Sequence, residues 1–598
     1  MLDYGIVGNC KTCALISKNG SVDWMCYPDF NSPSIFGKIL DAQIGGCMNV
    51  LPDRRCKVEQ KYLPNTNILE TTFTCKAYSF RILDFMPRYK KLTKKVYKQN
   101  ALVRILDPLR GIPKINVVFD PKPDYAQGDC ALQIQDGAIA AQHKSVTLML
   151  HSNLALGFIL ARSKIPLTKK SFLYLGESES PVTLARCMQL LRATRVYWQR
   201  WVNSLILPEQ NRDTIIRSAL TLKLMQYSET GAIIAAPTTS IPEELGTERT
   251  WDYRYCWIRD ATQCVDALVK IGRKHEAKKL INFLISNAMR EDFVHVLYTV
   301  HGSTEIPERI LPHLSGFRNS KPVRIGNAAA LQDQTDIFGE LIDILYLYFV
   351  YYEFEKKITK RYLRFLQYLV NQIKYKWKRQ DSSIWEFRSM LDHYTFSKLM
   401  CWVGVDRAIQ IAQHCHKDDL VHQWLPLRDA IKQDILEHGY DEKSRSFTIA
   451  YGKRGYDAAL LLIPYYGFLE PTAPRLRNTI KALYNNLSNK GLMQRYSIAD
   501  DFGKSKSIFT ICSFWLVQAL YLIGEQSASR EIYAQLMKYG NHLGLYSEDI
   551  SLKNKRLLGN FPQAYTHIAI INTSILLSEW NSSRKKIDWH TVKEGNLL

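Results

Sequence analysis

The chain has 598 residues, of which 46% are hydrophobic and 23% are charged. This is the composition of a folded globular protein, and it excludes a disordered or low-complexity chain. The 79 Lys and Arg residues outnumber the 57 Asp and Glu residues, which gives a formal net charge of +22. Such a charge permits contact with nucleic acid or anionic membranes, but it does not require either, because the basic residues are scattered along the chain.

The sequence predicts a cytoplasmic protein with no membrane partner. The best candidate span, residues 337–352, is short and contains Glu340 and Asp343, whereas a span needs about 20 mostly apolar residues. The N-terminus lacks the basic and apolar regions of a signal peptide. The 13 cysteines are widely spread, which fits reduced thiols. Cys10 and Cys13 form a CxxC pair with no second pair after it, so we expect no metal site.

Residues 1–181 predict an antiparallel β-sandwich domain. Short β-prone stretches such as 13–17 and 71–75 are bounded by turn residues. Many short strands with this punctuation are typical of a sandwich. Apolar residues then recur at helical spacing, which predicts a helical linker over residues 182–209.

Residues 210–598 predict a helical domain. Apolar residues recur every three or four positions in about a dozen segments. The loops between them are rich in aromatic and carboxylate side chains. Paired helices that close into a toroid would give one large core with a loop-lined mouth; a helical solenoid is the alternative, although no fixed repeat supports it. The segments are 214–227, 261–271, 275–288, 336–354, 357–377, 398–414, 418–439, 457–466, 475–487, 509–524, 528–539 and 564–578.

The loop at residues 251–260 reads Trp-Asp-Tyr-Arg-Tyr-Cys-Trp-Ile-Arg-Asp. Aromatic rings stack on the apolar faces of sugars, and an adjacent Arg–Asp pair offers donors and acceptors to their hydroxyl groups. The same residues would also suit an aromatic belt beneath a helix with an internal ion pair. Taken alone, this loop leaves both interpretations open.

Two glutamates in other loops are candidates for acid–base chemistry. Glu386 is flanked by Trp385 and Phe387; if these rings cover the carboxyl group, desolvation raises its pKa, which suits a general acid. Glu548 is a candidate base, with Asp549 beside it. Glycoside hydrolysis needs two carboxyl groups across the scissile bond, and they can come from distant loops. Each glutamate alone could equally be an ordinary loop residue.

Blocks of sequence along most of the chain carry a more specific signal. The strongest runs through Pro-Thr-Thr-Ser-Ile-Pro-Glu-Glu at 237–244 and on through the 251–260 loop. Further blocks lie at 20–24, 322–329, 457–461 and 559–564. Together and in this order they resemble glycoside hydrolase family 15, the glucoamylases and their trehalase relatives.

The resemblance implies an antiparallel β-sandwich followed by an all-α (α/α)6-barrel catalytic domain. It also implies inverting hydrolysis of α-glucosidic bonds with release of β-glucose, without a metal or an organic cofactor. Glu386 falls where the family keeps its general acid, and Glu548 where it keeps its general base. Tyr253 matches the tyrosine that orients the attacking water in this family. Trp257, Arg259 and Asp260 match the residues that bind the terminal glucose. Trp385 and Asp457 are also expected to bind substrate.

One segment departs from the family pattern. Residues 503–507 read Gly-Lys-Ser-Lys-Ser, where bacterial relatives usually have an acidic, glycine-containing stretch. Basic residues therefore replace an expected acid near the barrel mouth. We expect this change to alter either a hydroxyl contact or the region beyond the cleavage point, and hence substrate preference.

The leading hypothesis is an exo-acting α-glucosidase of the glucoamylase type, acting on maltooligosaccharides or α-glucan ends. An α,α-trehalase on the same scaffold is the alternative, because both would grip a terminal glucose in the same way. A carbohydrate-binding protein without turnover, or a polyanion binder suggested by the net charge, is a third reading, and the presence of both glutamates argues against it. The expected partner is therefore a small carbohydrate, with no nucleic acid.

Overall fold

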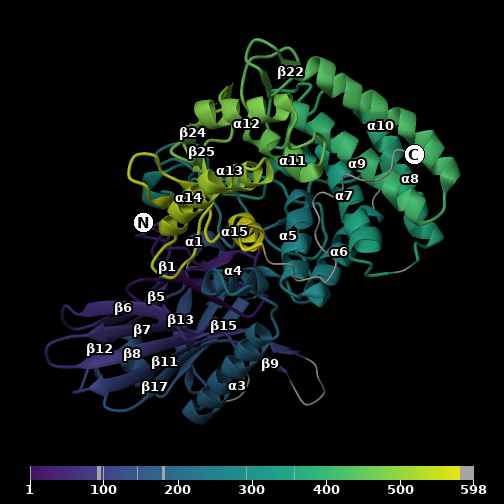
Figure 1. Ribbon diagram of the computed structural model, residues 1–598. Helices are drawn as coiled ribbons and strands as arrows, with labels where there is room; N and C mark the ends of the chain where they lie inside the picture. The colour runs from purple at the N-terminus through teal and green to yellow at the C-terminus, as the bar shows by residue number, and fades with distance from the viewer. Residues whose placement is uncertain are drawn as a thin grey trace.

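The computed structural model describes residues 2–90, 96–98, 100–128, 130–144, 146–177, 182–290, 293–355 and 357–579. The predicted end of the sandwich at residue 181 and the predicted barrel residues 580–598 lie outside these ranges. A β-rich body formed by the N-terminal part of the chain packs beneath a larger helical body (Figure 1). Among the described residues, no helix combines the length and the apolar composition that crossing a bilayer requires.

The N-terminal body is a sandwich of two antiparallel sheets, as the sequence predicts. One sheet has the order β1-β2-β3-β5-β12-β16, with β4 pairing to β3, and the other has the order β13-β14-β15-β17-β11-β8-β7-β6. The first sheet comprises β1 Tyr4–Gly8, β2 Cys13–Ser17, β3 Val22–Cys26, β4 Ser34–Phe36, β5 Cys47–Pro52, β12 Lys114–Asp120 and β16 Ile165–Pro166. The second comprises β6 Lys57–Tyr62, β7 Leu69–Thr74, β8 Ser79–Phe85, β11 Ala101–Arg110, β13 Ala131–Gln135, β14 Ala138–His143, β15 Val146–Ser152 and β17 Ser171–Gly176.

Smaller elements complete the sandwich: the hairpin β9 Arg88–Lys90 with β10 Val96–Lys98, and the short helices α1 Pro123–Ala126 and α2 Leu156–Leu160. The expectation that every cysteine is a free thiol is wrong for one pair. Cys56 and Cys75 form a disulfide with their Cα atoms 4.4 Å apart. The pairing of β6 with β7 brings these two residues together, which sequence spacing alone does not reveal. The other eleven cysteines are free, and most of them are buried.

Helix α3, Leu184–Asn203, lies within the range predicted as the linker. The Thr183 side chain caps its first turn by accepting a hydrogen bond from the Arg186 backbone N–H. The helix covers the outer face of the second sheet, where Cys187 and Leu190 join a buried cluster with Phe172. Because α3 is amphipathic, it buries one stripe on the sheet and leaves the other in solvent.

The helical body is a toroid of paired helices. The inner ring closes on itself, because each member contacts the next and α15 returns to α5. Its members are α5 Ile258–Lys270, α7 Asp336–Tyr346 with the π-turn η3 Leu347–Tyr351, α9 Thr395–His414, the segment η4 Ala458–Leu462 with α11 Ile463–Tyr466, α13 Thr510–Leu522 and α15 Ala564–Leu577. The outer helices are α4 Arg212–Met225 on α15, α6 Lys274–Ala288 on α5, α8 Lys360–Lys376 on α7, α10 Asp418–His438 on α9, α12 Pro474–Leu487 on η4 and α14 Gln526–Leu536 on α13.

This arrangement of six inner and six outer segments is the expected (α/α)6 barrel. The inner helices α13 and α15 are apolar and buried almost all round, as core helices should be. Gly339 on α7 and Gly404 on α9 permit close packing, because a Cβ atom built on Gly404 would lie 2.9 Å from the Gly339 Cα. With its sandwich, the chain as a whole is not all-α.

The loops of the barrel add short elements to the helices. These are the 3₁₀ turns η1 Phe317–Asn319, η2 Ala328–Leu331 and η5 Met537–Tyr539, and two-residue strands paired as β18 Cys256–Trp257 with β19 Leu297–Tyr298, β20 Arg309–Ile310 with β21 Arg324–Ile325, β22 Tyr440–Asp441 with β23 Ser446–Phe447, β24 Ser488–Asn489 with β25 Leu492–Met493, and β26 Ala499–Asp500 with β27 Gly503–Lys504. A three-stranded set joins β28 Ile508–Phe509, β29 Asp549–Ile550 and β30 Leu557–Leu558.

A buried ion pair ties the sandwich to the barrel loops. The Arg254 guanidinium contacts the Asp252 carboxylate at 2.6 Å, and both side chains have 0% exposure. Arg254 also donates to the Ser32 carbonyl at 2.8 Å and to the Tyr125 hydroxyl at 2.9 Å, both in the sandwich. Asp252 in turn accepts the Gly326 N–H at 3.1 Å in a barrel loop. The sandwich therefore holds the 251–260 loop in place.

We expect Arg254→Ala to destabilise the protein by about 3–5 kcal/mol, because it leaves the Asp252 carboxylate buried without a counter-charge. Urea unfolding followed by circular dichroism measures the change. Arg361→Ala, at an exposed position on α8, is the matched control and should stay within about 0.5 kcal/mol of the wild type. Equal losses in the two variants would show that the buried pair does not tie the bodies together.

Candidate active site

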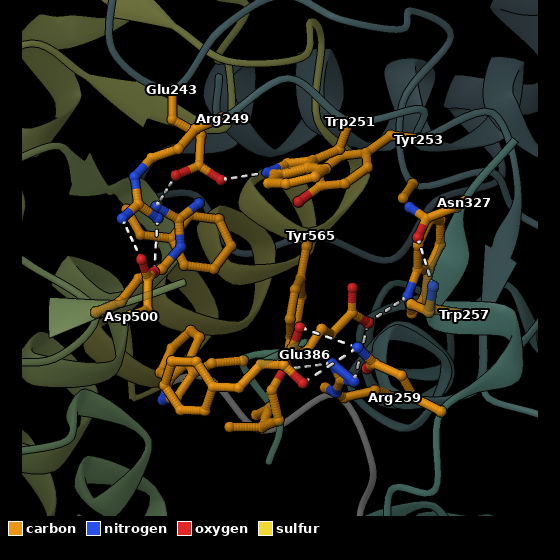
Figure 2. A pocket seen from close by; sticks show the side chains of 18 of the residues that line it. Glu243, Arg249, Trp251, Tyr253, Trp257, Arg259, Asn327, Glu386, Asp500 and Tyr565 are labelled. Atoms are coloured by element: carbon orange, nitrogen blue, oxygen red, sulfur yellow. Dashed lines mark hydrogen bonds and ion pairs between the residues drawn. The ribbon is translucent and has the colours of Figure 1, made fainter. Parts of the chain in front are cut away.

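A cavity opens where the loops that precede the inner helices meet. Its volume is about 1000 Å³, including the space open to solvent. The loops before α5, α9 and α13 supply Trp257, Glu386 and Phe509 to its wall. The cavity therefore lies at the N-terminal ends of the inner helices. Of the site residues predicted from the sequence, it is lined by Tyr253, Trp257, Arg259, Asp260, Trp385 and Glu386. Figure 2 labels Tyr253, Trp257, Arg259 and Glu386.

Glu386 points into this cavity and is held by two donors. Trp257 Nε1 donates to its Oε1 at 2.8 Å, and Arg259 Nη2 lies 3.4 Å from the same oxygen. The side chain is 23% exposed, and the two flanking rings have other partners. Trp385 instead turns toward Asp457, and Phe387 packs against Tyr394 and Tyr496.

The backbone of Glu386 adopts a left-handed conformation, with a φ of 62°. Ser383, three residues earlier, also has a positive φ of 64°, and the Glu386 N–H donates to the Ser383 carbonyl at 3.1 Å. This conformation costs a residue with a Cβ atom about 1–2 kcal/mol. The tight turn therefore aims the carboxylate at the cavity at a cost in backbone strain.

Arg259 joins the first turn of α5 to the loop that carries Glu386. Its Nη1 donates to the Ile384 carbonyl at 2.8 Å, and its Nε lies 3.5 Å from the buried Asp336 carboxylate. Asp260, the next residue, lines the cavity beside it. Burial raises the pKa of Asp260 to about 7, the Arg259 charge opposes this rise, and the Glu386 charge adds to it.

Glu548 lies behind the cavity wall, with 0% exposure. Its Oε1 accepts hydrogen bonds from the Tyr253 hydroxyl at 2.8 Å and from Arg495 Nη2 at 2.9 Å, and its Oε2 accepts the Asn560 N–H at 3.1 Å. Gly559 makes room for it, since a Cβ atom there would lie 2.7 Å from the Glu548 Cβ. Tyr253 and Arg495, which do line the cavity, connect Glu548 to it.

Arg495 is the counter-ion of three buried carboxylates. Its guanidinium lies 3.0 Å from Glu243, 2.9 Å from Glu548 and 3.2 Å from Asp549. Burial raises the pKa of Glu548 to about 7, the negative charge of Glu243 adds to this rise, and Arg495 and Tyr253 oppose it. One oxygen from each of the three acids lies within 4.8 Å of the others, the spacing that a cation site would have. In this protein the Arg495 guanidinium lies among the three carboxylates and supplies the positive charge that a cation would supply.

The buried Asp457 contacts the cavity wall through Trp385. Trp385 Nε1 donates to Asp457 Oδ1 at 2.9 Å, and the Ala459 N–H donates to the same oxygen at 2.8 Å. The Asp457 side chain is buried and is not part of the cavity wall. Burial raises its pKa to about 7. Asp457 therefore fixes the plane of the Trp385 indole.

The basic residues of the 503–507 segment point away from the cavity. Lys504 and Lys506 are exposed and do not line it. Asp500, Asp501 and Phe502, directly before the segment, line it instead. Two acidic residues therefore lie at the cavity directly before the basic segment.

Sequence reasoning missed several residues of the cavity wall. Arg495 gave no signal, because it is 53 residues from Glu548 and 252 residues from Glu243 along the chain. Glu243 lies in the 237–244 block, but the sequence predicted no role for it. Trp251 was visible only as part of the aromatic loop. Other wall residues for which the sequence predicted no role are Arg249, Asn327, Gln332, Arg388, Tyr496, Trp515, Gln563 and Tyr565.

Comparisons with known proteins agree with this geometry. The family described as "Glycosyl hydrolases family 15" matches residues 209–575, and "Trehalase-like, N-terminal" matches residues 3–158. The chain therefore belongs to glycosyl hydrolase family 15, and it is an enzyme of that class.

Individual relatives and structures are similar over nearly the whole chain. A trehalase of Mycobacterium tuberculosis is 35% identical, with 96% of this chain and 89% of the relative covered. A trehalase of Thermoplasma volcanium is 33% identical, with 96% and 93% covered. The crystal structure of a bacterial glucoamylase complexed with acarbose superimposes with a TM-score of 0.69 at 14% identity, covering 96% of this chain and 93% of the other. This last similarity concerns the fold alone.

The left-handed turn at Glu386 can be tested by comparing Glu386→Gly with Glu386→Ala. Both variants delete the carboxylate, but only glycine removes the strain of the positive φ. We expect the glycine variant to be more stable than the alanine variant by about 1 kcal/mol. Thermal and urea unfolding measure the difference. An alanine variant as stable as the glycine variant would show that the turn carries no such strain.

Proposed function

We propose that this protein is an inverting α,α-trehalase, with Glu386 as the general acid and Glu548 as the general base. The observation that carries the proposal is the similarity to six curated trehalases, at 31–35% identity over 94–96% of this chain. The similarity to a glucoamylase is only 14% and supports the barrel, not the substrate. The relatives thus favour trehalase, the alternative of the sequence analysis, over its leading hypothesis of a glucoamylase.

The environment of Glu386 supports the role of general acid. Trp257 and Arg259 both contact Oε1, which leaves Oε2 to carry the proton toward the glycosidic oxygen. The adjacent aromatic and polar groups of Trp257, Arg259 and Asp260 suit the ring face and hydroxyls of a glucose bound there. Protonation of the leaving oxygen by a positioned carboxylic acid is the first half of the inverting mechanism.

The environment of Glu548 supports the role of general base. A base with a pKa near the working pH accepts a proton efficiently, and the pKa of Glu548 is raised to about 7. The Tyr253 hydroxyl lines the cavity and donates to Glu548 at 2.8 Å. In the proposed step Tyr253 orients the attacking water and accepts its proton while passing its own hydroxyl proton to the buried Glu548, and the anomeric carbon inverts.

The roles of the two glutamates predict the effect of neutral, isosteric replacements. Glu386→Gln and Glu548→Gln should each fold and lower kcat on trehalose by at least about a hundredfold, the contribution of general acid–base catalysis. Glucose release from trehalose, maltose and maltotriose measures the activity and the substrate preference together. Glu437→Gln, an exposed position on α10, is the control. A wild type that acts on maltotriose and not on trehalose would overturn the proposed function.

The charge of Glu243 predicts a shift in the pH profile. A general base works only when it is deprotonated, so kcat/KM should fall as the pH drops below about 7, the pKa of Glu548. Because Glu243 raises that pKa, Glu243→Gln should lower it and move the acidic limb of the profile to lower pH. An acidic limb that stays in place, or that moves to higher pH, would show that Glu243 does not tune the base.

A further inference from the structure

The segment that joins η2 to α7 runs beside the loop of the proposed general acid. Its residues, 332–336, comprise the connection after η2 and the first residue of α7. The Ser382 N–H donates to the Asp333 carbonyl at 3.1 Å, and the Thr335 N–H donates to the buried Asp381 carboxylate at 2.9 Å. These bonds fix the 332–336 segment to the start of the loop that carries the acid.

The side chains of the 332–336 segment differ in the side that they face. Asp333 is half exposed and pairs with Lys376 on α8. Gln334 and Asp336 have 0% exposure, and Gln332 lines the cavity. Every second residue of the segment is therefore turned toward the acid, and Asp333 is turned toward solvent.

Gln332 supports the strained turn at Glu386 from outside. Its Nε2 donates to the carbonyl oxygens of Glu386 at 3.0 Å and of Phe387 at 3.3 Å. Its Oε1 accepts a hydrogen bond from Gln334 Nε2 at 2.9 Å, so the two amides form one chain. A left-handed residue with a side chain persists only where its surroundings hold it, and this chain supplies part of that support.

The Arg259 guanidinium lies between Asp336 and Glu386. Its Nε is 3.5 Å from Asp336 Oδ2, and its Nη2 is 3.4 Å from Glu386 Oε1 (Figure 2). The same Nη2 donates to Gln334 Oε1 at 2.5 Å. Two carboxyl groups at almost equal distances therefore share one positive charge.

The charge of Asp336 matters to the acid because it opposes that of Arg259. A guanidinium beside a carboxyl group favours the ionised form of that group, which has no proton to give. A second carboxylate on the same guanidinium offsets this effect. Burial raises the pKa of Asp336, and the Arg259 charge and the backbone N–H groups of Asp336 and Ile337 at the start of α7 oppose the rise.

Other titratable groups surround this ion pair. They are Asp260 on α5, Glu340 on α7, Asp381 before α9, Lys398 and Cys401 on α9, and Tyr565 on α15. Because a substitution at Asp336 or Gln334 leaves all of them in the chain, a difference from the wild type reports the residue that was changed.

We propose that the 332–336 segment positions the general acid, and that Asp336 keeps this acid able to donate its proton by offsetting the charge of Arg259. The inference rests on the proposed function only in giving Glu386 the role of the acid. Gln334 and Asp336 do not line the cavity, so they act through Arg259 and are positioning residues.

The test compares kcat/KM for trehalose with kcat/KM for α-glucosyl fluoride over a range of pH. Fluoride leaves without a proton from the acid, whereas the sugar leaving group of trehalose needs one, and the base serves both substrates. The ratio of trehalose activity to fluoride activity therefore reports the protonated fraction of the acid, and it falls as the pH rises. Glu386→Gln should give a low ratio at every pH.

Asp336→Asn keeps the shape of the side chain and removes its charge. With less negative charge beside Arg259, the acid ionises more readily. The midpoint of the ratio should therefore move about one pH unit lower, which lowers the ratio by up to about tenfold. Activity on α-glucosyl fluoride should change much less.

Gln334→Glu is a second isosteric variant, with the opposite expected sign. It places another carboxylate on the Arg259 guanidinium, so the midpoint of the ratio should move to higher pH. Asp333→Asn, the same substitution as Asp336→Asn on the solvent side of the segment, is the control and should leave the ratio and both activities unchanged. Thermal unfolding checks that each variant folds.

The inference is overturned if Glu386→Gln lowers the ratio but a folded Asp336→Asn or Gln334→Glu variant leaves its midpoint unchanged. It is also overturned if Asp336→Asn lowers both activities by the same factor, which is the result of a purely structural role. A Glu386→Gln variant with the wild-type ratio would instead overturn the proposed acid. If the wild type cleaves maltotriose and not trehalose, the proposed substrate fails, and the same ratio measured with maltotriose still decides the role of the segment.

Discussion

The charge of one guanidinium, that of Arg495, is the constraint on which the catalytic end of the barrel depends. Glu243, Glu548 and Asp549 are all buried around it, and a buried carboxylate without a counter-charge is strongly destabilising. Burial raises the pKa of Glu548 and of Asp549, and the neighbouring negative charges, which one guanidinium cannot neutralise, add to this rise. The pKa of Glu548, raised to about 7, is the chemical consequence. Burial therefore gives the proposed base its proton affinity, and the Arg495 contacts that hold the loops together limit it.

The remainder of the structure positions the loops around this cluster. The inner helices bring the loops before α5, α9 and α13 to one end of the toroid. The sandwich adds the buried Arg254–Asp252 pair, which anchors the aromatic loop from outside the barrel. Sugar chemistry needs side chains from many loops at fixed separations, and rigid elements on both sides of a loop supply that precision. The N-terminal domain is in this sense part of the active site, although its strands do not line the cavity.

Local patterns in the sequence predicted the elements well, because the outer helices carry an apolar periodicity and the inner helices α13 and α15 are long apolar segments. The segment 418–439 was expected to be helical and α10 spans Asp418–His438. The cavity residues in the 251–260 loop were visible because they are contiguous. Arg495, Glu243 and Asp500 were not predicted, since their partners lie far away in the chain and only the closed toroid brings them together. The Cys56–Cys75 disulfide was missed for the same reason, because it depends on tertiary contacts that neighbouring residues do not encode.

The family and the fold leave the stereochemistry of the reaction as the central question, and NMR of the first glucose released from trehalose answers it most directly. Both linked carbons of trehalose have the α configuration. If Glu548 directs water to the face opposite the leaving group while Glu386 protonates that group, one β-glucose and one α-glucose form in each turnover. We predict equal initial amounts of the two anomers, before mutarotation mixes them. Initial release of α-glucose alone would contradict the assignment of acid and base on which this interpretation rests.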